Sequence, residues 1–244
     1  MTVRQLFRDI FRETLVAHGF GYKYNHFYRL NGEMLQGVTV VPLSGGGYFL
    51  RVACYPYWMH DLINKTKLKN TFKKPYWAEQ FDVENGELSF FSQESSGNCV
   101  MMERQLQGFV ANVLPALDAI CDVQSMSKAI MNESVVNWVD SKLLLYVCNG
   151  NGSFDFAKEY LAIQKKKFFS PENVRKLSWG QPNEITSEEL HTRWQDFVSY
   201  HMSLLFESME NDDLEYVLAP YKANREAMKE RLRKELKIDV SHSE

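Results

Sequence analysis

The spacing of apolar residues changes twice along the chain, and no other feature of the sequence constrains the fold as strongly. Apolar side chains recur at helical spacing over residues 3–17. From residue 21 to about residue 93 they alternate with polar side chains, which is the period of a β-strand. Helical spacing returns over residues 98–120 and continues after Val123 to about residue 237. Strand periodicity between helical segments predicts an α+β fold.

Two Asn-Gly dipeptides divide the alternating segment into hairpins. Asn31-Gly32 and Asn85-Gly86 each lie between runs of alternating polarity. This dipeptide is typical of a two-residue type I′ turn, in which both positions have positive φ. We therefore expect an antiparallel meander of four to five strands, with helices 3–17 and 98–121 on one face of the sheet.

Local signals set the ends of the helices. Thr2 and Gln5 have the spacing of a capping box at the start of the first helix, and Gly19 suits its end. Pro115 lies inside the helical pattern of residues 98–120, where it predicts a kink or a break.

The change in periodicity also suggests a division of the chain. We expect an α+β domain over residues 1–122 and a helical C-terminal region over residues 123–244, packed against it. Helices are predicted in this second part at about 133–148, 153–168, 187–209 and 212–237.

Composition places the chain among soluble globular proteins. Of its 244 residues, 45% are apolar and 24% are charged, which excludes a disordered or fibrous chain. The 28 basic and 31 acidic residues leave a net charge of -3, so the strong positive bias of a general nucleic-acid binder is absent. The sequence contains no run of apolar residues that approaches the roughly 18 residues needed to span a membrane. Its first residues lack the apolar core of a secretory signal peptide. We therefore expect a cytoplasmic protein without a membrane partner, and the sequence does not indicate its oligomeric state.

Residues 18–29 carry a resemblance to a known family. His18-Gly19-Phe20-Gly21 ends a helix, and Asn25-His26-Phe27-Tyr28-Arg29 begins a basic and aromatic strand. This order resembles the opening of a bacterial family catalogued as domain of unknown function number 4304, over about the first 55 residues. The resemblance implies the order of the elements and a bacterial origin. It implies no catalytic residue, and Gly21-Tyr22 departs from the more basic residues expected there.

Three motifs that could carry chemistry are better explained by structure. Ser44-Gly45-Gly46-Gly47 leads into a strand, whereas a phosphate-binding loop leads into a helix. By strand alternation Cys54 shares a face with Leu50 and Val52, which indicates a buried and unreactive thiol. Glu188 and His191 have the spacing of a di-iron motif, but this motif is needed twice and the chain has no second copy. The four cysteines have no zinc-ligand spacing. We therefore predict no catalytic, cofactor-binding or metal-binding residue.

A lysine-rich segment is the one local pattern that resembles a nucleic-acid footprint. Its basic residues are Lys65, Lys67, Lys69, Lys73 and Lys74. Phe72 lies among these lysines, and Tyr76 and Trp77 follow them. Lysines can contact phosphates and aromatic rings can stack on bases. We favour a solvated loop or a guarded sheet edge, because acidic residues flank the segment and the net charge is negative.

Two further groups of residues are candidates for a binding surface. The tyrosines Tyr22, Tyr24 and Tyr28 are expected on one strand, and Tyr55 and Tyr57 on another. Tyrosine is enriched among residues that dominate binding energy, but the same side chains could be buried under the helical half. Arg4, Arg8 and Arg12 lie one above another on the first helix, where like charges repel. Acidic groups of the C-terminal half, solvent or, less often, an acidic partner would offset this repulsion.

Two classes of function remain open. We favour a non-enzymatic protein-binding module, which neutralises or docks onto another protein through the tyrosines or the arginines. The alternative is an enzyme or a nucleic-acid-associated factor whose polar residues converge only in three dimensions, as catalytic groups commonly do.

Overall fold

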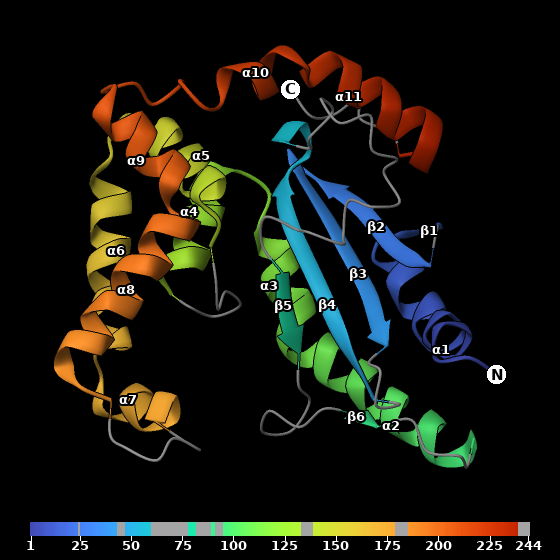
Figure 1. Cartoon of the computed structure of the whole chain (residues 1–244). Helices are drawn as coiled ribbons and strands as arrows, with labels where there is room; N and C mark the ends of the chain where they lie inside the picture. The colour runs from blue at the N-terminus through green and yellow to red at the C-terminus, as the bar shows by residue number, and fades with distance from the viewer. Residues whose placement is uncertain are drawn as a thin grey trace. The chain divides into compact units, whose positions relative to one another are not determined.

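The chain folds into two compact units (Figure 1). A computed structural model describes residues 1–23, 25–42, 47–59, 78–81, 89–90, 95–132, 139–178 and 185–238. Unit 1 comprises Met1–Val139 and Pro220–Glu244, and unit 2 comprises Asp140–Ala219. The chain thus leaves unit 1, forms unit 2 and returns. This division differs from the predicted boundary after Asp122, because helices Val123–Met131 and Arg225–Arg231 group with the sheet.

Unit 1 combines a β-sheet with helices, which confirms the α+β class. Its helices are α1 (Val3–Ala17), α2 (Ser95–Gly108), α3 (Leu114–Ala119), α4 (Val123–Met131) and α11 (Arg225–Arg231), with the 3-10 turn η1 (Tyr57–Met59) and the π-helical turns η3 (Phe109–Val113) and η4 (Leu232–Leu236). Its strands are β1 (Gly21–Lys23), β2 (His26–Asn31), β3 (Met34–Pro42), β4 (Gly47–Pro56), β5 (Ala78–Phe81) and β6 (Ser89–Phe90). Among the residues described, no helix has the length and apolar character needed to span a membrane.

The sheet is an antiparallel meander, as the sequence predicts. Strands β1 to β5 lie side by side in chain order, and β6 pairs with the first residues of β4. The prediction that Tyr22 and Tyr28 share one strand is wrong. The chain reverses between Lys23 and His26, which pair across the β1–β2 hairpin. Asn25 makes this reversal possible, because it adopts the left-handed conformation (φ 67°) that Asn tolerates better than most residues.

The turn at Asn31-Gly32 joins β2 to β3, but it is not of type I′. Asn31 pairs with Met34, so the two-residue loop is Gly32-Glu33. Gly32 has φ 57°, whereas Asn31 and Glu33 do not have positive φ. Positive φ at the first loop position alone is the pattern of a type II′ turn, which requires Gly there.

The helix-end signals of the first half are confirmed. The Thr2 hydroxyl accepts a hydrogen bond from the Gln5 amide, and the Gln5 side chain accepts one from the Thr2 amide. The predicted break at Pro115 takes the form of η3. Because Pro115 has no amide hydrogen, the preceding turn widens, and the Leu114 amide bonds the Phe109 carbonyl five residues back.

Both faces of the central strands are buried. Phe27 of β2 contacts Phe7 of α1, with ring centroids 5.4 Å apart, and Gln36 of β3 lies on the same face and bonds Leu117 of α3. Tyr28 points to the opposite face, because neighbouring residues of a strand alternate. On both faces the described side chains of β3 from Met34 to Val40 are buried.

Residues from the C-terminal part of the chain contact the second face. Lys23, which pairs with His26 on the side of Tyr28, donates to the Glu235 carbonyl of η4. The Arg225 guanidinium donates to the Tyr57 hydroxyl (2.8 Å) at the end of β4. Helix α11 lies between these two contacts along the chain, because it begins at Arg225 and leads into η4. The last helices therefore complete the core of the unit that the first residues begin.

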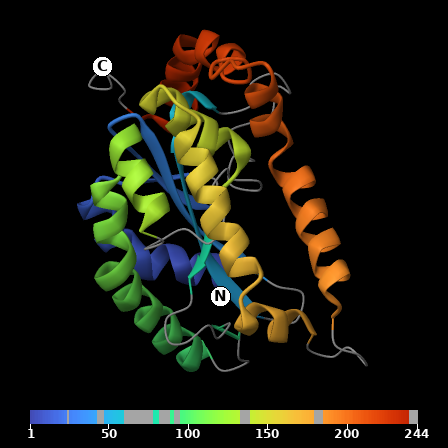
Figure 2. The same cartoon turned by 90° about the vertical axis from the view of Figure 1, so that its left-hand side faces the viewer.

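Unit 2 is helical. Its helices are α5 (Ser141–Asn151), α6 (Asp155–Phe168), α7 (Pro171–Ser178), α8 (Ser187–His201) and α9 (Ser203–Glu210), and α10 (Ala219–Ala223) joins it to unit 1. Figures 1 and 2 show α7 at the end where α6 stops and α8 starts, and α9 at the other end. The predicted helices 187–209 and 212–237 are each interrupted. Helix α7 begins at Pro171, because Pro suits the first helical position.

Replacing Gly32 by Ala should destabilise unit 1 more than the same change at Gly19. Both glycines have positive φ, which costs an Ala residue about 1–2 kcal/mol. A Cβ at Gly19 meets no atom within 4 Å, but a Cβ at Gly32 overlaps the Cys121 carbonyl. This overlap should add about 1–3 kcal/mol, measured by urea unfolding. Equal losses for the two variants would show that the turn is not packed against Cys121.

Candidate functional site

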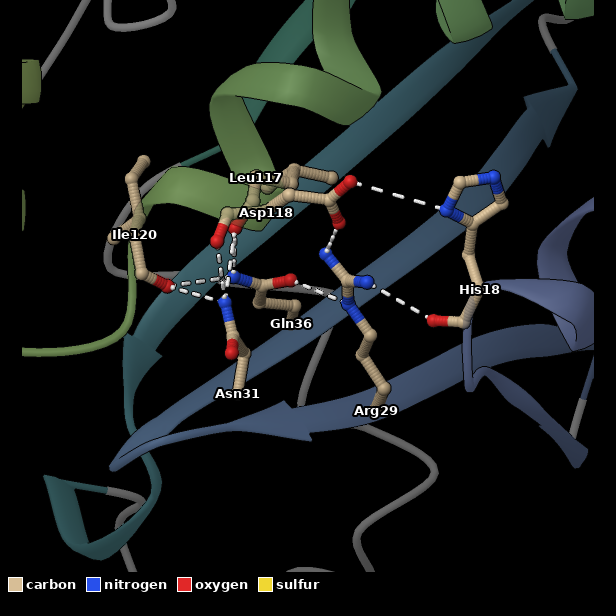
Figure 3. Close-up of polar contacts among 7 residues, drawn as sticks. All are labelled: His18, Arg29, Asn31, Gln36, Leu117, Asp118 and Ile120. Carbon is tan, nitrogen blue, oxygen red and sulfur yellow. Dashed lines mark hydrogen bonds and ion pairs between the residues drawn. The ribbon is translucent and has the colours of Figure 1, made fainter.

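A polar network fixes the end of α3 to the sheet (Figure 3). Gln36 is fully buried, and its amide nitrogen donates to the carbonyls of Leu117 (2.6 Å) and Ile120 (2.9 Å). The Asn31 amide donates to the Asp118 carbonyl (3.0 Å) in the same turn. The last carbonyls of a helix have no partner within the helix. Two strand residues therefore supply the donors, and we call this arrangement the helix-end clamp.

Arg29 extends the helix-end clamp to α1. Its Nε donates to Gln36 Oε1 (2.8 Å), Nη1 donates to the His18 carbonyl (2.9 Å), and Nη2 forms an ion pair with Asp118 (2.6 Å). The guanidinium also lies 4.5 Å from the centre of the Phe20 ring. Each guanidinium nitrogen thus has a partner, and one side chain joins the end of α1, β3 and the end of α3.

The contacts of the helix-end clamp join parts of the fold to one another. His18 Nδ1 lies 3.8 Å from Asp118, and both side chains are more than 40% exposed. The same Asp118 carboxylate is bound by Arg29, and the amides of Gln36 and Asn31 are directed at helix carbonyls (Figure 3). These contacts account for the polar groups without a substrate.

Replacing Gln36 by Leu should destabilise the protein by about 1–3 kcal/mol, because the substitution leaves buried carbonyls with fewer donors. The matched control is Gln107→Leu on the exposed surface of α2, where a change below about 0.5 kcal/mol is expected. Chemical denaturation measures both. Equal stability of the two variants would remove the helix-end clamp as a stabilising element.

The structure separates the predicted tyrosines. Tyr28, Tyr55 and Tyr57 expose no more than 2% of their surface, so as the chain is folded they belong to the core and offer no contact to a partner. Tyr22 is half-buried and lies against Phe27 on the other face of the sheet, with ring centroids 4.7 Å apart. Tyr24 lies outside the described residues. A single tyrosine-rich recognition face is therefore not formed.

The predicted arginines form a basic surface beside Tyr22, which we call the arginine corner: Arg4, Arg8, Arg12 and Tyr22. Arg4 and Arg12 are exposed, and Arg8 is half-buried and pairs with Asp9 (2.7 Å). Burial raises the pKa of the Tyr22 hydroxyl, and the charges of Arg8 and Arg4 oppose this shift. The charges of Arg4 and Arg8 thus act on Tyr22, and Arg12 continues the same face of α1.

His26 lies beside Tyr28, on the face of the sheet opposite to Tyr22. Its ring packs 5.9 Å from the Tyr28 ring, and burial, assisted by the charge of Arg4, lowers its pKa to about 4. His26 is therefore neutral in the folded protein at pH 7.

The stability of unit 1 should fall as the pH decreases from 7.5 to 5. The pKa of His26 is near 6.5 in the unfolded chain and about 4 in the folded one. The unfolded chain therefore takes up the proton first, and the stability present above pH 6.5 is lost towards pH 4. The expected loss by pH 5 is about 2 kcal/mol. His26→Gln should show a smaller loss in urea titrations at both pH values; an unchanged pH dependence would contradict the shift.

The remaining predicted motifs show no reactive site in the described part of the chain. Cys54 is fully buried, and burial raises the pKa of its thiol far above the ordinary value, as expected for an unreactive cysteine. No cluster of three or more metal-binding side chains occurs among the described residues. The lysine segment with Lys65, Lys67, Lys69, Lys73 and Lys74, and most of the glycine-rich loop, lie outside them.

A groove in unit 2 was not predicted from the sequence. It has a volume of about 420 Å³ between α6, α7 and α8, and we call it the aromatic groove. Its lining comprises Gln164, Lys167, Phe168, Ser170, Glu172, Asn173, Trp194 and Phe197. Trp194 and Phe197 stack with ring centroids 5.6 Å apart, and Phe168 lies 5.2 Å from Trp194. These three rings are only half-buried, which leaves apolar surface for a ligand.

Local spacing explains part of the aromatic groove. Trp194 and Phe197 are three residues apart on α8, so they share one helix face. Phe168 ends α6, more than twenty residues earlier. The sequence could have indicated the stripe on α8, but not its pairing with α6.

No protein-family model, curated protein or solved structure matches this chain. The resemblance to domain of unknown function number 4304 over about the first 55 residues therefore stays an expectation from the sequence.

Proposed function

We propose that the protein is a non-enzymatic protein-binding module that holds an acidic segment of another protein at the arginine corner. The observation that carries this proposal is the exposure of Arg4 and Arg12 on one face of α1. Within the described part of the chain, neither side chain has an acidic group within ion-pair distance.

The chemistry of arginine supports an acidic ligand. Three like charges at a spacing of four residues repel one another by about 0.2–0.5 kcal/mol per pair. Among the described residues, the Asp9 carboxylate forms its ion pair with Arg8. A guanidinium binds a carboxylate through two parallel hydrogen bonds, which gives both energy and orientation. Carboxylates from a partner would relieve the repulsion along the stripe.

Tyr22 adds an aromatic contact to this surface. It is half-buried against Phe27, so its position is fixed before binding. Rigid tyrosines beside arginines are typical of residues that dominate binding energy. Tyr28, Tyr55 and Tyr57 have no part in this surface, because they are buried.

Charge reversal at the arginine corner should strongly reduce partner capture. Arg4→Glu/Arg12→Glu changes the net charge by the same amount as the control Lys128→Glu/Lys158→Glu, whose side chains are exposed elsewhere. Tagged wild type, variant and control are used for affinity purification from the source organism, followed by quantitative mass spectrometry.

A specific partner should be recovered by wild type and control and reduced by roughly tenfold or more with the arginine variant, as expected for the loss of central charged contacts. Equal recovery by all three proteins would contradict the proposal. Melting temperatures confirm that the variants fold.

A further inference from the structure

Unit 2 carries opposite charges at its two ends. Residues 164–176 contain five basic residues and one acidic residue, a net charge of +4. Residues 207–215 contain five acidic residues and no basic residue, a net charge of -5. Figures 1 and 2 place α7 at one end of the unit and α9 at the other. The fifteen residues of α8 separate these ends by about 22 Å.

The basic end contains the aromatic groove. Phe168, Trp194 and Phe197 form its walls, and Lys167 lines its rim, with Lys165 exposed in the same turn of α6. Lysines in the last turn of a helix also suit its dipole, so charge alone would not indicate a site. The positive charge of these lysines and the half-buried rings of the groove together favour a ligand that carries an aromatic or apolar side chain next to carboxylates.

The acidic end offers that chemistry. Asp212 and Asp213 are exposed, and Tyr216, three residues further, exposes 48% of its surface. The turn is held in place: the Asp213 amide donates to the Ser208 carbonyl (3.1 Å), and the Glu215 amide donates to the Asp213 carboxylate (2.8 Å). An ordered turn loses little conformational entropy on binding.

We propose that unit 2 of one molecule pairs with unit 2 of a second copy in an antiparallel, two-fold arrangement. Tyr216 of each copy enters the aromatic groove of the other, and Asp212 and Asp213 meet Lys165 and Lys167. A two-fold axis makes both contacts at once. The distance between the ends prevents Tyr216 from reaching the groove of its own chain.

The charge of unit 2 as a whole favours a second copy over a nucleic acid. Residues 140–219 contain 13 acidic and 8 basic residues, a net charge of -5. A phosphate backbone would be attracted at one end and repelled elsewhere. Two antiparallel copies instead bring each positive end to a negative end. This contact does not involve the arginine corner, so the two proposals can fail independently.

Light scattering after size-exclusion chromatography tests the pairing on the full chain. At about 100 μM protein and about 0.05 M salt, where screening is weak, the wild type should approach about 57 kDa, twice the monomer mass of 28.5 kDa. Raising the salt to about 0.5 M should increase the dimer Kd by roughly tenfold or more.

Charge exchange identifies the contact. Lys165→Glu/Lys167→Glu and Asp212→Lys/Asp213→Lys should each yield monomers, and the combined fourfold variant should dimerise again. Tyr216→Ser should weaken the dimer by roughly tenfold, as for loss of an aromatic anchor. The control Arg104→Glu/Lys128→Glu changes the charge equally at exposed sites of unit 1 and should dimerise as the wild type does.

A monomeric wild type under these conditions would overturn the proposal, even if an acidic peptide or a nucleic acid bound the aromatic groove. A dimer that persists in both charge-reversed variants, or a fourfold variant that stays monomeric, would also overturn it. Circular dichroism confirms that each variant is folded.

Discussion

The short helix α3 ends directly against the sheet, and its last carbonyls cannot all be left to solvent. This constraint determines much of unit 1. Gln36 is buried in the largely apolar strand β3 because its amide is the donor for two of these carbonyls. Arg29 then holds the Gln36 oxygen, the Asp118 carboxylate and the last carbonyl of the α1 cap. A buried polar group is stable only when its partners are complete, so these residues must be in place together.

The β2–β3 turn also packs against the chain that follows α3. The Glu33 amide donates to the Cys121 carbonyl, and the Gly32 backbone lies so close to that carbonyl that no side chain fits. The β2–β3 turn and the residues after α3 are therefore one packed unit. A polar helix end, and not a large apolar surface alone, sets the register between the helical layer and the meander.

Local signals predicted the parts of the fold that depend on neighbouring residues. The ends of α1, the break at Pro115 and the antiparallel meander follow from capping, proline chemistry and alternation. Alternation predicted that Tyr22 and Tyr28 share one strand, which is wrong. The chain reverses at Asn25 without the Gly that marks most such turns. The turn type at Gly32 depends on which residues of β2 and β3 pair with each other. A shift of this pairing by one residue changes which residues occupy the loop.

The candidate sites likewise divide into those that follow from neighbouring residues in the sequence and those that depend on contacts between distant residues. The arginine stripe follows from helical spacing, so Arg4, Arg8 and Arg12 were found from the sequence. The helix-end clamp joins Gln36 to Leu117, and the aromatic groove joins Phe168 to Trp194. Neither pairing leaves a local pattern. Burial of Tyr28 and Tyr55 likewise depends on what covers both faces of the sheet, which strand periodicity alone does not reveal.

The return of the chain to unit 1 after unit 2 has a consequence for synthesis. On the ribosome, segments emerge from the N-terminus onwards, and domains generally fold as they become complete. Unit 2 is complete once Ala219 has emerged, but unit 1 still lacks α11 and η4. The contacts of Tyr57 with Arg225 and of Lys23 with η4 form last. The unit that begins first therefore finishes second, and its second sheet face is uncovered on that side while the nascent chain grows.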